Sequence, residues 1–552
     1  MQTKKIDIPE QAQIVIVGGG IIGCSLAYHL TKFGCKDVVV LEREQLTSGT
    51  TWHAAGLVVS GLLSDETSAD IFTYGRDLYS RLEEETGLAT GFKSVGYLQI
   101  ACDEERLEEM RRSAAFMRTR GINCNEITVD EVREHWPKAK LDDVIAGFFT
   151  SEDGRANPVD LTMSLAKGAR NQGARIIEGV SVTGVHKQQG RVTGVSTDQG
   201  DIEAPIVVNC AGMWARQFGE MAGVNLPLQA AEHYYLITDN MEGMHRDLPI
   251  LEDPDSYAYY REEVGGLMIG LFEPVAKAWN VDHIPENFAF GEIDPDMDRM
   301  MPFLEKAYER VPEAIELGIR KFFCGPESFT PDLAPLVGEA PELENYFVAC
   351  GLNSLGILSA GGIGRLLARW IMDGRPDCDV SGINVNRFHN CQRNPKYRED
   401  RLVEVLGKMY EPHFPNLGMS KARNVKQSVL HERLLKAGAH FNESAGWEIA
   451  DWYATDGKPG VVERYSWGRQ NWFTDHEAEH HAARNDVVLM DMSFMSKFLV
   501  QGNDACKVLN QICCNEIDVE DGRIVYTQWT NEAGGLEADL TVTRLDRNEY
   551  MV

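Results

Sequence analysis

The chain has 552 residues and a formal net charge of -30 at pH 7. This length exceeds what one hydrophobic core usually organises, so two or more domains are expected. Hydrophobic residues make up 43% and charged residues 25% of the chain, as in ordinary globular proteins, and no apolar run reaches the roughly 20 residues of a membrane helix. The acidic excess argues against nucleic acid and anionic membranes as partners.

The 12 cysteines are scattered and never show the C-x-x-C spacing of a structural zinc site or a thioredoxin-like pair. We expect reduced core cysteines and no metal. The first residues, MQTKKIDIPEQAQ, contain no apolar secretory segment and are not rich in Arg and Ser as transit peptides are. A cytoplasmic protein is expected, or the processed form of a protein of the mitochondrial matrix.

The N-terminal region has the pattern of a dinucleotide-binding unit. A β-branched strand, Ile14 to Val17, enters the G-x-G-x-x-G run that starts at Gly18, and a helical pattern follows. These glycines allow a tight turn, approach to a pyrophosphate, and close packing of helix on strand. A second strand ends at Glu42, about 20 residues beyond the motif, where a ribose-binding acid is expected. The predicted contacts are Gly18, Gly20, Ile21, Ile22, Gly23, Glu42 and Arg43.

The loop that follows distinguishes FAD from NAD. Its residues 50–57, T-T-W-H-A-A-G-L, resemble the flavinylation segment of the dimethylglycine and sarcosine dehydrogenase family. The resemblance implies that His53 is bonded covalently to the flavin. A neutral imidazole is a competent nucleophile toward an activated flavin methyl group. The alternative for a lone histidine is a buried, hydrogen-bonded side chain. Further contacts are implied for Gly49, Thr50, Thr51, Trp52, Gly56 and Leu57.

Three later segments are similar to the same family. They are the strand Arg175 to Val185, the run V-V-N-C-A-G-M-W-A that ends at Ala215, and a glycine-rich turn after the strand Tyr346 to Cys350. A helix follows that turn, and its amino end would stabilise the negative charge of reduced flavin. The resemblance implies cofactor contacts from Val182, Gly212, Gly351, Leu355, Gly356 and Ile357.

The predicted fold class is α/β and α+β. The family resemblance implies a Rossmann-like FAD-binding domain of the D-amino-acid and sarcosine oxidase type, with an inserted substrate-binding sheet, followed by the start of an aminomethyltransferase-like folate domain. The oxidoreductase domain is expected over residues 1–385, with FAD-binding segments at about 1–60, 150–230 and 320–385 and substrate-binding segments at about 60–150 and 230–320. Residues 386–426 form a polar connector, and 427–552 begin the folate domain.

Oxidation of an N-methyl amine moves a hydride to flavin and requires a free lone pair on nitrogen, so a group that relays the amine proton is expected nearby. The resemblance implies His233 and Tyr259 in this role. Strand alternation places Tyr257, Tyr259 and Arg261 on one face and Tyr260 on the other. The choice of Tyr259 among the three tyrosines rests on the match of Arg261 and Gly270. That arginine is either a clamp for a substrate carboxylate or a surface ion pair.

The C-terminal segment Tyr526 to Val542 looks like the part of the folate domain whose aspartate faces tetrahydrofolate, and Asp539 is the matching acid. A carboxylate there could hold or deprotonate the folate nitrogen that attacks an iminium. The chain ends at Val552 inside a predicted strand. Two interpretations stay open: the chain is a fragment, or its folate domain is degenerate and does not bind the cofactor.

One motif is interpreted as a coincidence. His476 to His480 satisfies H-E-x-x-H, which can bind zinc on a helix. The surrounding sequence lacks the apolar stripe of a buried helix, and no third ligand is evident. A solvated helix is expected.

The family resemblance implies FAD-dependent oxidative N-demethylation of dimethylglycine or sarcosine. The iminium product would pass to tetrahydrofolate or be hydrolysed to formaldehyde, and electrons would leave to an electron-transfer flavoprotein or to oxygen. Two alternatives remain. One is a regulatory paralogue, like the phosphatase regulatory subunit of the same architecture. The other is a flavin demethylase for another N-methyl compound, such as a betaine derivative. The oligomeric state is open.

Overall fold

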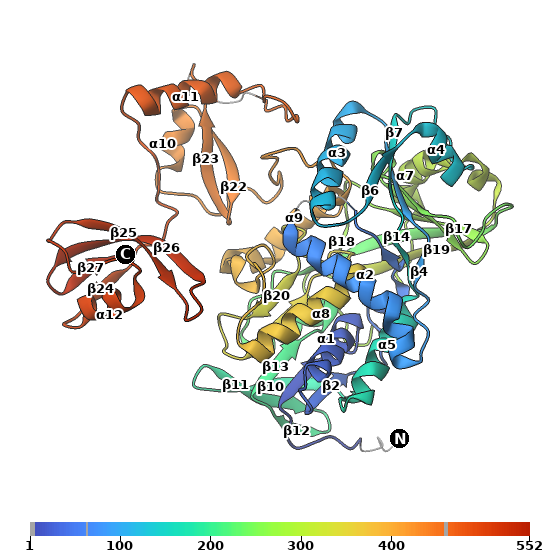
Figure 1. Cartoon of the computed structure of the whole chain (residues 1–552), viewed down its shortest axis with the longest axis horizontal. Helices are drawn as coiled ribbons and strands as arrows, with labels where there is room; N and C mark the ends of the chain where they lie inside the picture. The colour runs from blue at the N-terminus through green and yellow to red at the C-terminus, as the bar shows by residue number, and fades with distance from the viewer. Residues whose placement is uncertain (1–5, 62–64, 457–461) are drawn as a thin grey trace. The chain divides into compact units, whose positions relative to one another are not determined.

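The computed structural model describes residues 6–61, 65–456 and 462–552 (Figure 1). By their internal contacts they form two compact units. The first comprises the chain up to Val425 together with Val462–Phe473, and the second comprises Lys426–Val461 and Thr474–Val552. None of the described helices has both the length and the apolarity needed to cross a membrane.

The first unit is built on a six-stranded sheet with the order β20-β21-β13-β1-β2-β9. Five neighbouring strands run parallel, and β20 pairs antiparallel at one edge. The central strands are short apolar runs buried on both faces, as parallel strands between two layers must be. The bounds are β1 Ile14–Val17, β2 Val38–Glu42, β9 Arg175–Glu178, β13 Ile206–Asn209, β20 Leu336–Glu339 and β21 Tyr346–Cys350.

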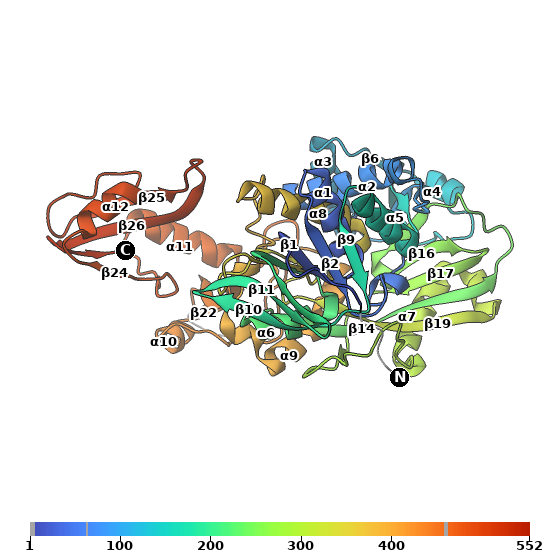
Figure 2. The ribbon, with the colours of Figure 1, turned by 90° about the horizontal axis from the view of Figure 1, so that it is seen from below.

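Layers cover both faces of this sheet (Figures 1 and 2). Because successive side chains of a strand point to opposite faces, Ile16 of β1 packs with the helices of one layer, and Val15 packs with a three-stranded sheet and a helix on the other. The helical layer contains α1 Ile21–Lys32, α2 Glu66–Thr86, α5 Pro158–Asn171 and α8 Gly356–Asp373. The opposite layer contains β10 Val182–Gln188, β11 Arg191–Thr197, β12 Gly200–Glu203 and α6 Ala215–Ala222.

The inserted sheet that the sequence predicted is present and has nine strands. Its order is β18-β14-β17-β16-β15-β5-β7-β6, and β19 pairs with β14. One face packs on helices through side chains such as Tyr260 and Leu304. The strands are β5 Tyr97–Ala101, β6 Cys124–Ile127, β7 Ala146–Thr150, β14 Gln229–Asn240, β15 Ile250–Asp253, β16 Ala258–Glu263, β17 Gly266–Leu271, β18 Ala278–Trp279 and β19 Ile319–Phe329, and the neighbouring helices are α3 Glu104–Thr119, α4 Val129–His135 and α7 Met297–Arg310.

Three short strands form a further small sheet in the first unit. They form a three-stranded sheet in the order β3-β8-β4, with β3 Leu57–Val58, β4 Lys93–Ser94 and β8 Gly154–Arg155. Residues 386–426, for which a polar connector was expected, contain α9 Pro395–Val405 and further helical turns. Leu402, Val405 and Tyr410 are buried in one cluster with Tyr259 and Phe272 of the nine-stranded sheet. This segment therefore packs over the face of the sheet that carries Tyr259.

The second unit contains two small sheets. One is the hairpin of β22 Ala439–Ser444 and β23 Trp447–Tyr453, and the other is four-stranded, in the order β24-β27-β26-β25. A small core forms around Leu509 and Tyr550, whereas Val487 and Leu489 are 92% and 90% exposed. The remaining elements are α10 His431–Lys436, α11 Phe473–Asn485, α12 Ala505–Ile512, β24 Leu499–Gln501, β25 Ile524–Thr530, β26 Leu536–Asp546 and β27 Glu549–Met551.

Candidate functional site

A cavity of about 410 Å³ lies in the first unit, against residues that end or follow the parallel strands β1, β2, β13 and β21. Ligands of open α/β sheets bind at this edge. Most of the residues predicted to contact the cofactor line the cavity: Gly18, Gly20, Ile21, Ile22, Glu42, Arg43, Gly49, Thr50, Thr51, Val182, Gly212, Gly351, Gly356 and Ile357.

The three motif glycines have different surroundings. Gly18 has φ +115°, and a Cβ there would lie 2.3 Å from the carbonyl oxygen of Cys210. A Cβ on Gly20 would lie 3.3 Å from Thr51 Oγ1, so this position keeps the backbone open to the cavity. Gly23 does not line the cavity, and its contact with the cofactor stays a prediction. A Cβ on Gly23 would lie 2.1 Å from the Gly18 carbonyl oxygen, so its function is the packing of α1 on β1.

Glu42 and Arg43 contribute charge to this cavity. The backbone N–H of Gly19 donates to Glu42 Oε2 at 2.7 Å and that of Glu44 to Oε1 at 2.9 Å, so the carboxylate fixes the glycine turn. Burial raises the pKa of Glu42. The Arg43 guanidinium lies 4.6 Å from the ring centroid of Trp214, and its Nε is buried without a hydrogen-bond partner among the described residues. Arg43 therefore keeps a donor for a bound group.

A second cavity, of about 270 Å³, contains the other predicted residues: His53, Gly56, Leu57, His233, Tyr259 and Leu355. Ala54, Glu327, Ser354 and Ile357 line both cavities, so the two adjoin. Trp52 belongs to neither lining, and the prediction that it contacts the cofactor is not supported by this geometry. Its indole packs edge-on against His53, with 5.4 Å between ring centroids. Trp52 therefore packs against the His53 ring without lining either cavity.

His53 lies in the 3₁₀ turn Thr51–His53 and is 6% exposed. Burial lowers the pKa of its imidazole to about 4, although Glu327 opposes the shift. The ring is therefore neutral near pH 7, with Phe323 at 5.1 Å between centroids. A Cβ on Gly325 would lie 2.9 Å from His53 Cε1, so the glycine leaves room for the ring.

His233 lies on β14, where it pairs with Gly325 of β19. The side chain is buried, and its ring centroid is 4.7 Å from that of Phe272. Its Nδ1 is buried and has no hydrogen-bond partner among the described residues. Burial lowers the pKa of His233. A neutral ring with an unpartnered nitrogen is suited to exchange a proton with a bound molecule.

Tyr259 lies on β16 opposite Gly270 of β17. A Cβ on Gly270 would lie 1.9 Å from Tyr259 Cζ, so the glycine makes the space in which the phenol ring lies. Burial raises the pKa of Tyr259, which keeps the hydroxyl protonated. Tyr260 faces the opposite side and donates to the carbonyl oxygen of Ala307 at 3.2 Å.

One expectation about this strand is wrong. Tyr257 precedes β16, which begins at Ala258, and has a left-handed φ of 58°, yet it packs against the buried cluster that contains Tyr259. Arg261 is not a surface ion pair, since it is 7% exposed, and its Nη1 lies 2.6 Å from Glu263 Oε2. It lies outside the lining of the second cavity. The geometry therefore favours an internal ion pair over a clamp on a substrate.

The lining residues of the second cavity that sequence reasoning missed include Glu252, Glu327 and Tyr410. Glu327 lies in a G-P-E-S-F-T-P-D segment, in which nothing local assigns a role to the acid. Glu252 and Tyr410 come from distant segments, and the Tyr410 hydroxyl donates to Glu252 Oε2 at 3.1 Å. No local pattern indicates that these two side chains meet.

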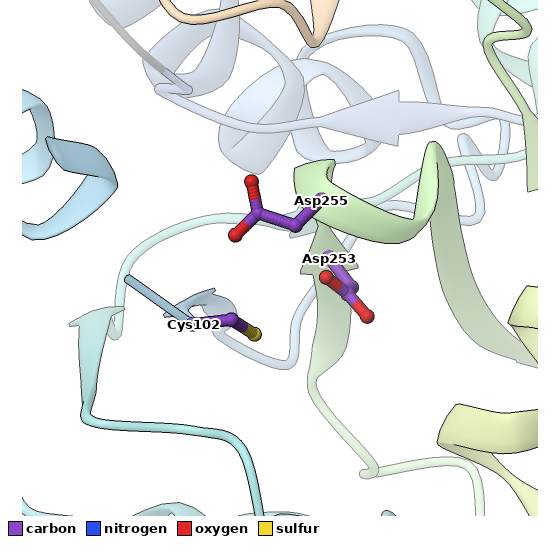
Figure 3. Close-up of side chains that lie close together, drawn as sticks. All are labelled: Cys102, Asp253 and Asp255. Atoms are coloured by element: carbon purple, nitrogen blue, oxygen red, sulfur yellow. The ribbon is translucent and has the colours of Figure 1, made fainter. Parts of the chain in front are cut away.

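Two groups of side chains in the described residues resemble metal sites by residue type. Cys102, Asp253 and Asp255 have ligand atoms within 4.8 Å of one another (Figure 3). Arg310 donates to Asp253 at 2.8 Å, and Arg106 donates to Asp255 at 3.2 Å. These guanidinium groups already balance the carboxylates, so the cluster is an internal ion-pair network. The H-E-x-x-H segment lies on α11, which has no buried residue, in agreement with the expected solvated helix.

Asp539 lies on β26 opposite Gln528 of β25, in the second unit. Gln528 Nε2 donates to its Oδ1 at 2.9 Å, and a hydrogen bond from Tyr526 lowers the pKa of the carboxyl group. Tyr526 is 62% exposed. The folate-like acid is therefore an ionised side chain on an exposed face of the sheet.

Comparison with known families agrees with this architecture. The chain belongs to the FAD dependent oxidoreductase family, which matches residues 13–370. The central domain of FAD dependent oxidoreductases matches residues 373–428, and the GCVT N-terminal domain matches residues 430–552. The family defines FAD as the cofactor.

Individual relatives share this architecture. The 4-methylaminobutanoate oxidase (formaldehyde-forming) of Paenarthrobacter nicotinovorans is 41% identical over 99% of this chain and 66% of its own length. The mitochondrial sarcosine dehydrogenase of Homo sapiens is 37% identical over 98% of this chain and 61% of its own length. The chain thus spans somewhat less than two thirds of these relatives. The L-proline dehydrogenase of P. horikoshii has a similar structure, with TM-score 0.60, 26% identity, and coverage of 71% of this chain and 98% of that one.

The residues of the first cavity fit FAD. Gly18 and Gly20 have no side chains, so a bound pyrophosphate could approach their backbone closely. Arg43 Nε and Ser328 Oγ are buried polar atoms without partners among the described residues, and both residues belong to the lining. The adjoining second cavity holds neutral His53 where the two linings meet.

Proposed function

We propose that this protein oxidises the N-methyl group of a small methylated amino acid, such as dimethylglycine or sarcosine, with FAD attached covalently to His53. The observation that carries the proposal is the shared cavity of His53, His233 and Tyr259, next to the cavity that fits FAD. The three side chains come from separate segments, and each is buried. Relatives that span the whole chain are named for oxidation of N-methyl amino acids.

FAD, when bound, supplies an acceptor for a hydride. Gly18, Gly20 and Arg43 would hold its phosphates, Glu42 would face the ribose of the adenosine half, and Val182 would pack near the adenine. The helix that begins at Gly356 directs free backbone N–H groups toward its amino end. Residues Gly351 to Ile357 would therefore lie against the flavin, where these donors favour negative charge on the reduced ring.

His53 has the protonation state that attachment requires. A neutral imidazole is nucleophilic, and the pKa of about 4 leaves His53 neutral throughout the physiological range. His233 would take the amine proton through Nδ1, and the protonated Tyr259 hydroxyl would orient the amine by a hydrogen bond. Burial of all three excludes bulk water from the place where the iminium forms.

The second unit would pass the one-carbon group on. We infer that Asp539 faces a folate, as the GCVT N-terminal domain suggests, and that its ionised carboxylate holds the folate nitrogen that attacks the iminium. The electron acceptor would be an electron-transfer flavoprotein or oxygen. The two relatives bear different names in this respect, an oxidase and a dehydrogenase.

Two measurements test the proposal. The purified protein is precipitated with acid, and yellow colour that stays in the washed pellet is expected; a colourless pellet would refute covalent attachment. The holoenzyme is then mixed anaerobically with dimethylglycine, sarcosine, 4-methylaminobutanoate or trimethylglycine, and bleaching of the flavin is recorded. At least one secondary or tertiary amine should bleach it. Failure of all four would favour a regulatory protein of the same architecture.

A further inference from the structure

Glu327 is a buried carboxylate that the roles above leave unexplained. It lies on β19, paired with Ala231 of β14, and side chains at alternate positions of a strand share a face. Glu327 therefore points to the same side as Phe323 and Gly325, where His53 lies. It lines both cavities and is 7% exposed. Its charge acts on the pKa values of His53 and His233.

One oxygen of this carboxylate has no partner. Glu327 Oε2 is buried and makes no hydrogen bond to the described residues. The cavity contains a second carboxylate, Glu252, but its oxygens accept from Gln99 Nε2 at 2.8 Å and from the Tyr410 hydroxyl at 3.1 Å. A buried charge without a partner is costly, so such groups are retained where a ligand completes them. Glu327 therefore indicates a bound cation or donor.

The charge of the cavity favours a cation. Its described lining contains Glu252 and Glu327 but no Lys or Arg. Histidines 53 and 233 are buried with lowered pKa values, so they add no positive charge near pH 7. The third histidine of the lining, His413, pairs with Glu109, outside the lining, at 2.8 Å. Aromatic rings, whose faces attract methylated ammonium groups, complete the wall: Tyr97, Tyr235, Tyr259, Phe272, Phe323 and Tyr410.

We propose that Glu327 is the anionic subsite that binds the positively charged nitrogen of the substrate, so that this cavity selects an N-methylated ammonium group. The proposal rests on the function proposed above and assigns the recognition of the nitrogen to one residue. It also places the recognition of a substrate carboxylate away from this wall, because a carboxylate beside Glu327 would be repelled.

The Glu327 carboxylate would interact with the positive charge of both the ammonium substrate and the iminium product. The substrate enters as an ammonium ion, and its N–H bond breaks as the proton passes to neutral His233. Bound FAD would accept the hydride from the methyl carbon, and the nitrogen lone pair would form the C=N bond of the iminium. Positive charge thus returns to the nitrogen beside Glu327 as hydride leaves. An anion fixed at that point stabilises the transition state.

The first test compares the binding of two compounds of nearly equal shape. Trimethylglycine has a positively charged nitrogen at the position where 3,3-dimethylbutanoate has a neutral carbon. Their dissociation constants for the purified full chain are measured by calorimetry. We expect the wild type to prefer trimethylglycine by about tenfold or more, and Glu327→Gln to lose this preference. If Glu327→Gln keeps the wild-type preference, the assignment is wrong.

The second test uses matched carboxylate variants. In anaerobic flavin reduction, Glu327→Gln should raise the substrate Kd and slow reduction, both by about tenfold or more, and Glu327→Asp should recover part of each. Glu126→Gln is the control, because Glu126 is an exposed partner of Arg111 outside the cavity lining, and it should leave both constants unchanged. Equal effects of the two Gln variants would show that Glu327 has no specific role in binding the substrate nitrogen.

These outcomes can be separated from failure of the proposed function. The preference between the two compounds does not require the reaction, so it tests Glu327 even in a protein that no N-methyl amine reduces. Thermal melting and flavin absorbance of each variant report whether it is folded and loaded. A folded Glu327→Gln protein that still binds and oxidises the amine like the wild type would refute the proposal alone.

Discussion

The two units place their ionisable side chains in opposite environments. In the first unit His53, His233 and Glu327 are each less than 8% exposed, and burial lowers the pKa values of both histidines. In the second unit Asp539 lies on an exposed face beside Tyr526. Family motifs point to both places. The difference shows that burial, which is a tertiary property, converts a side chain into a reagent with an altered protonation state.

The largest expected effect follows from the removal of the buried His53. His53→Ala should abolish covalent flavin, so that an acid precipitate of the variant is colourless while the wild type stays yellow. His480→Ala changes a histidine of the exposed helix α11 and should leave the colour in the pellet. Yellow pellets from His53→Ala would show that another residue holds the flavin. Absorbance of the redissolved pellets near the flavin maximum measures the difference.

A large difference in stability is also expected between buried and exposed ion pairs. Arg310 Nε donates to the fully buried Asp253 at 2.8 Å. Arg310→Met should reduce the free energy of unfolding of the first unit by about 3–5 kcal/mol, because the carboxylate is left without its cation.

The matched change is Arg544→Met in the second unit. Its partners Asp518 and Asp521 have side chains that are 64% and 63% exposed. Solvent screens this network, so a smaller loss is expected. Urea unfolding followed separately by flavin fluorescence and by far-ultraviolet circular dichroism compares the variants. Equal losses would contradict the distinction between the two units.

Two neighbouring tyrosines of β16 differ in the face of the sheet on which they lie, and their Phe variants should differ in the rate of flavin reduction. Tyr259→Phe should slow anaerobic flavin reduction about 100-fold, since the hydroxyl faces the cavity and is proposed to orient the amine. Tyr260→Phe is the control, because its hydroxyl bonds Ala307 on the opposite face of the sheet. That variant should reduce at the wild-type rate. Stopped-flow absorbance distinguishes the two, and equal rates would remove Tyr259 from the reaction.

The smallest expected effect concerns pH. The pKa of His53 is lowered from 6.5 to about 4, so its neutral form is lost only as the pH falls through about 4. When flavin-free protein is incubated with FAD, the rate of covalent attachment should therefore change little between pH 8 and pH 5. An ordinary histidine would be mostly protonated at pH 5. A rate that halves near pH 6.5 would show that His53 is not shielded by burial.

Much of the cofactor cavity could be predicted because its signals are local. The strand that ends at Val17, the glycine turn and the strand that ends at Glu42 are contiguous, and the turn geometry requires these residue types. Local patterns could not distinguish residues that line a cavity from residues that pack against the lining. Gly23 and Trp52 belong to the recognised motifs, yet one packs α1 on β1 and the other packs behind His53.

The second cavity was predicted less completely. His233 and Tyr259 were named from a family resemblance, and the structure brings both to one cavity with His53. Local patterns placed Tyr257 within the strand, but β16 begins at Ala258 and Tyr257 itself has a left-handed φ. Tyr410 was missed because the segment 386–426 is polar in composition, and only its fold buries Leu402 and Tyr410 against the sheet.

The sequence by itself determined the dinucleotide-binding turn, the family-like segment around His53 and the two-part organisation, because each depends on residues close together in the chain. Only the tertiary structure decided which side chains meet. Glu327 and His233 are far apart in the sequence, and the pairing of β14 with β19 brings them to one cavity, which His53 of the turn Thr51–His53 also lines. Their burial there sets the charge of the cavity, since desolvation depends on everything that surrounds a group and not on its neighbours in the chain.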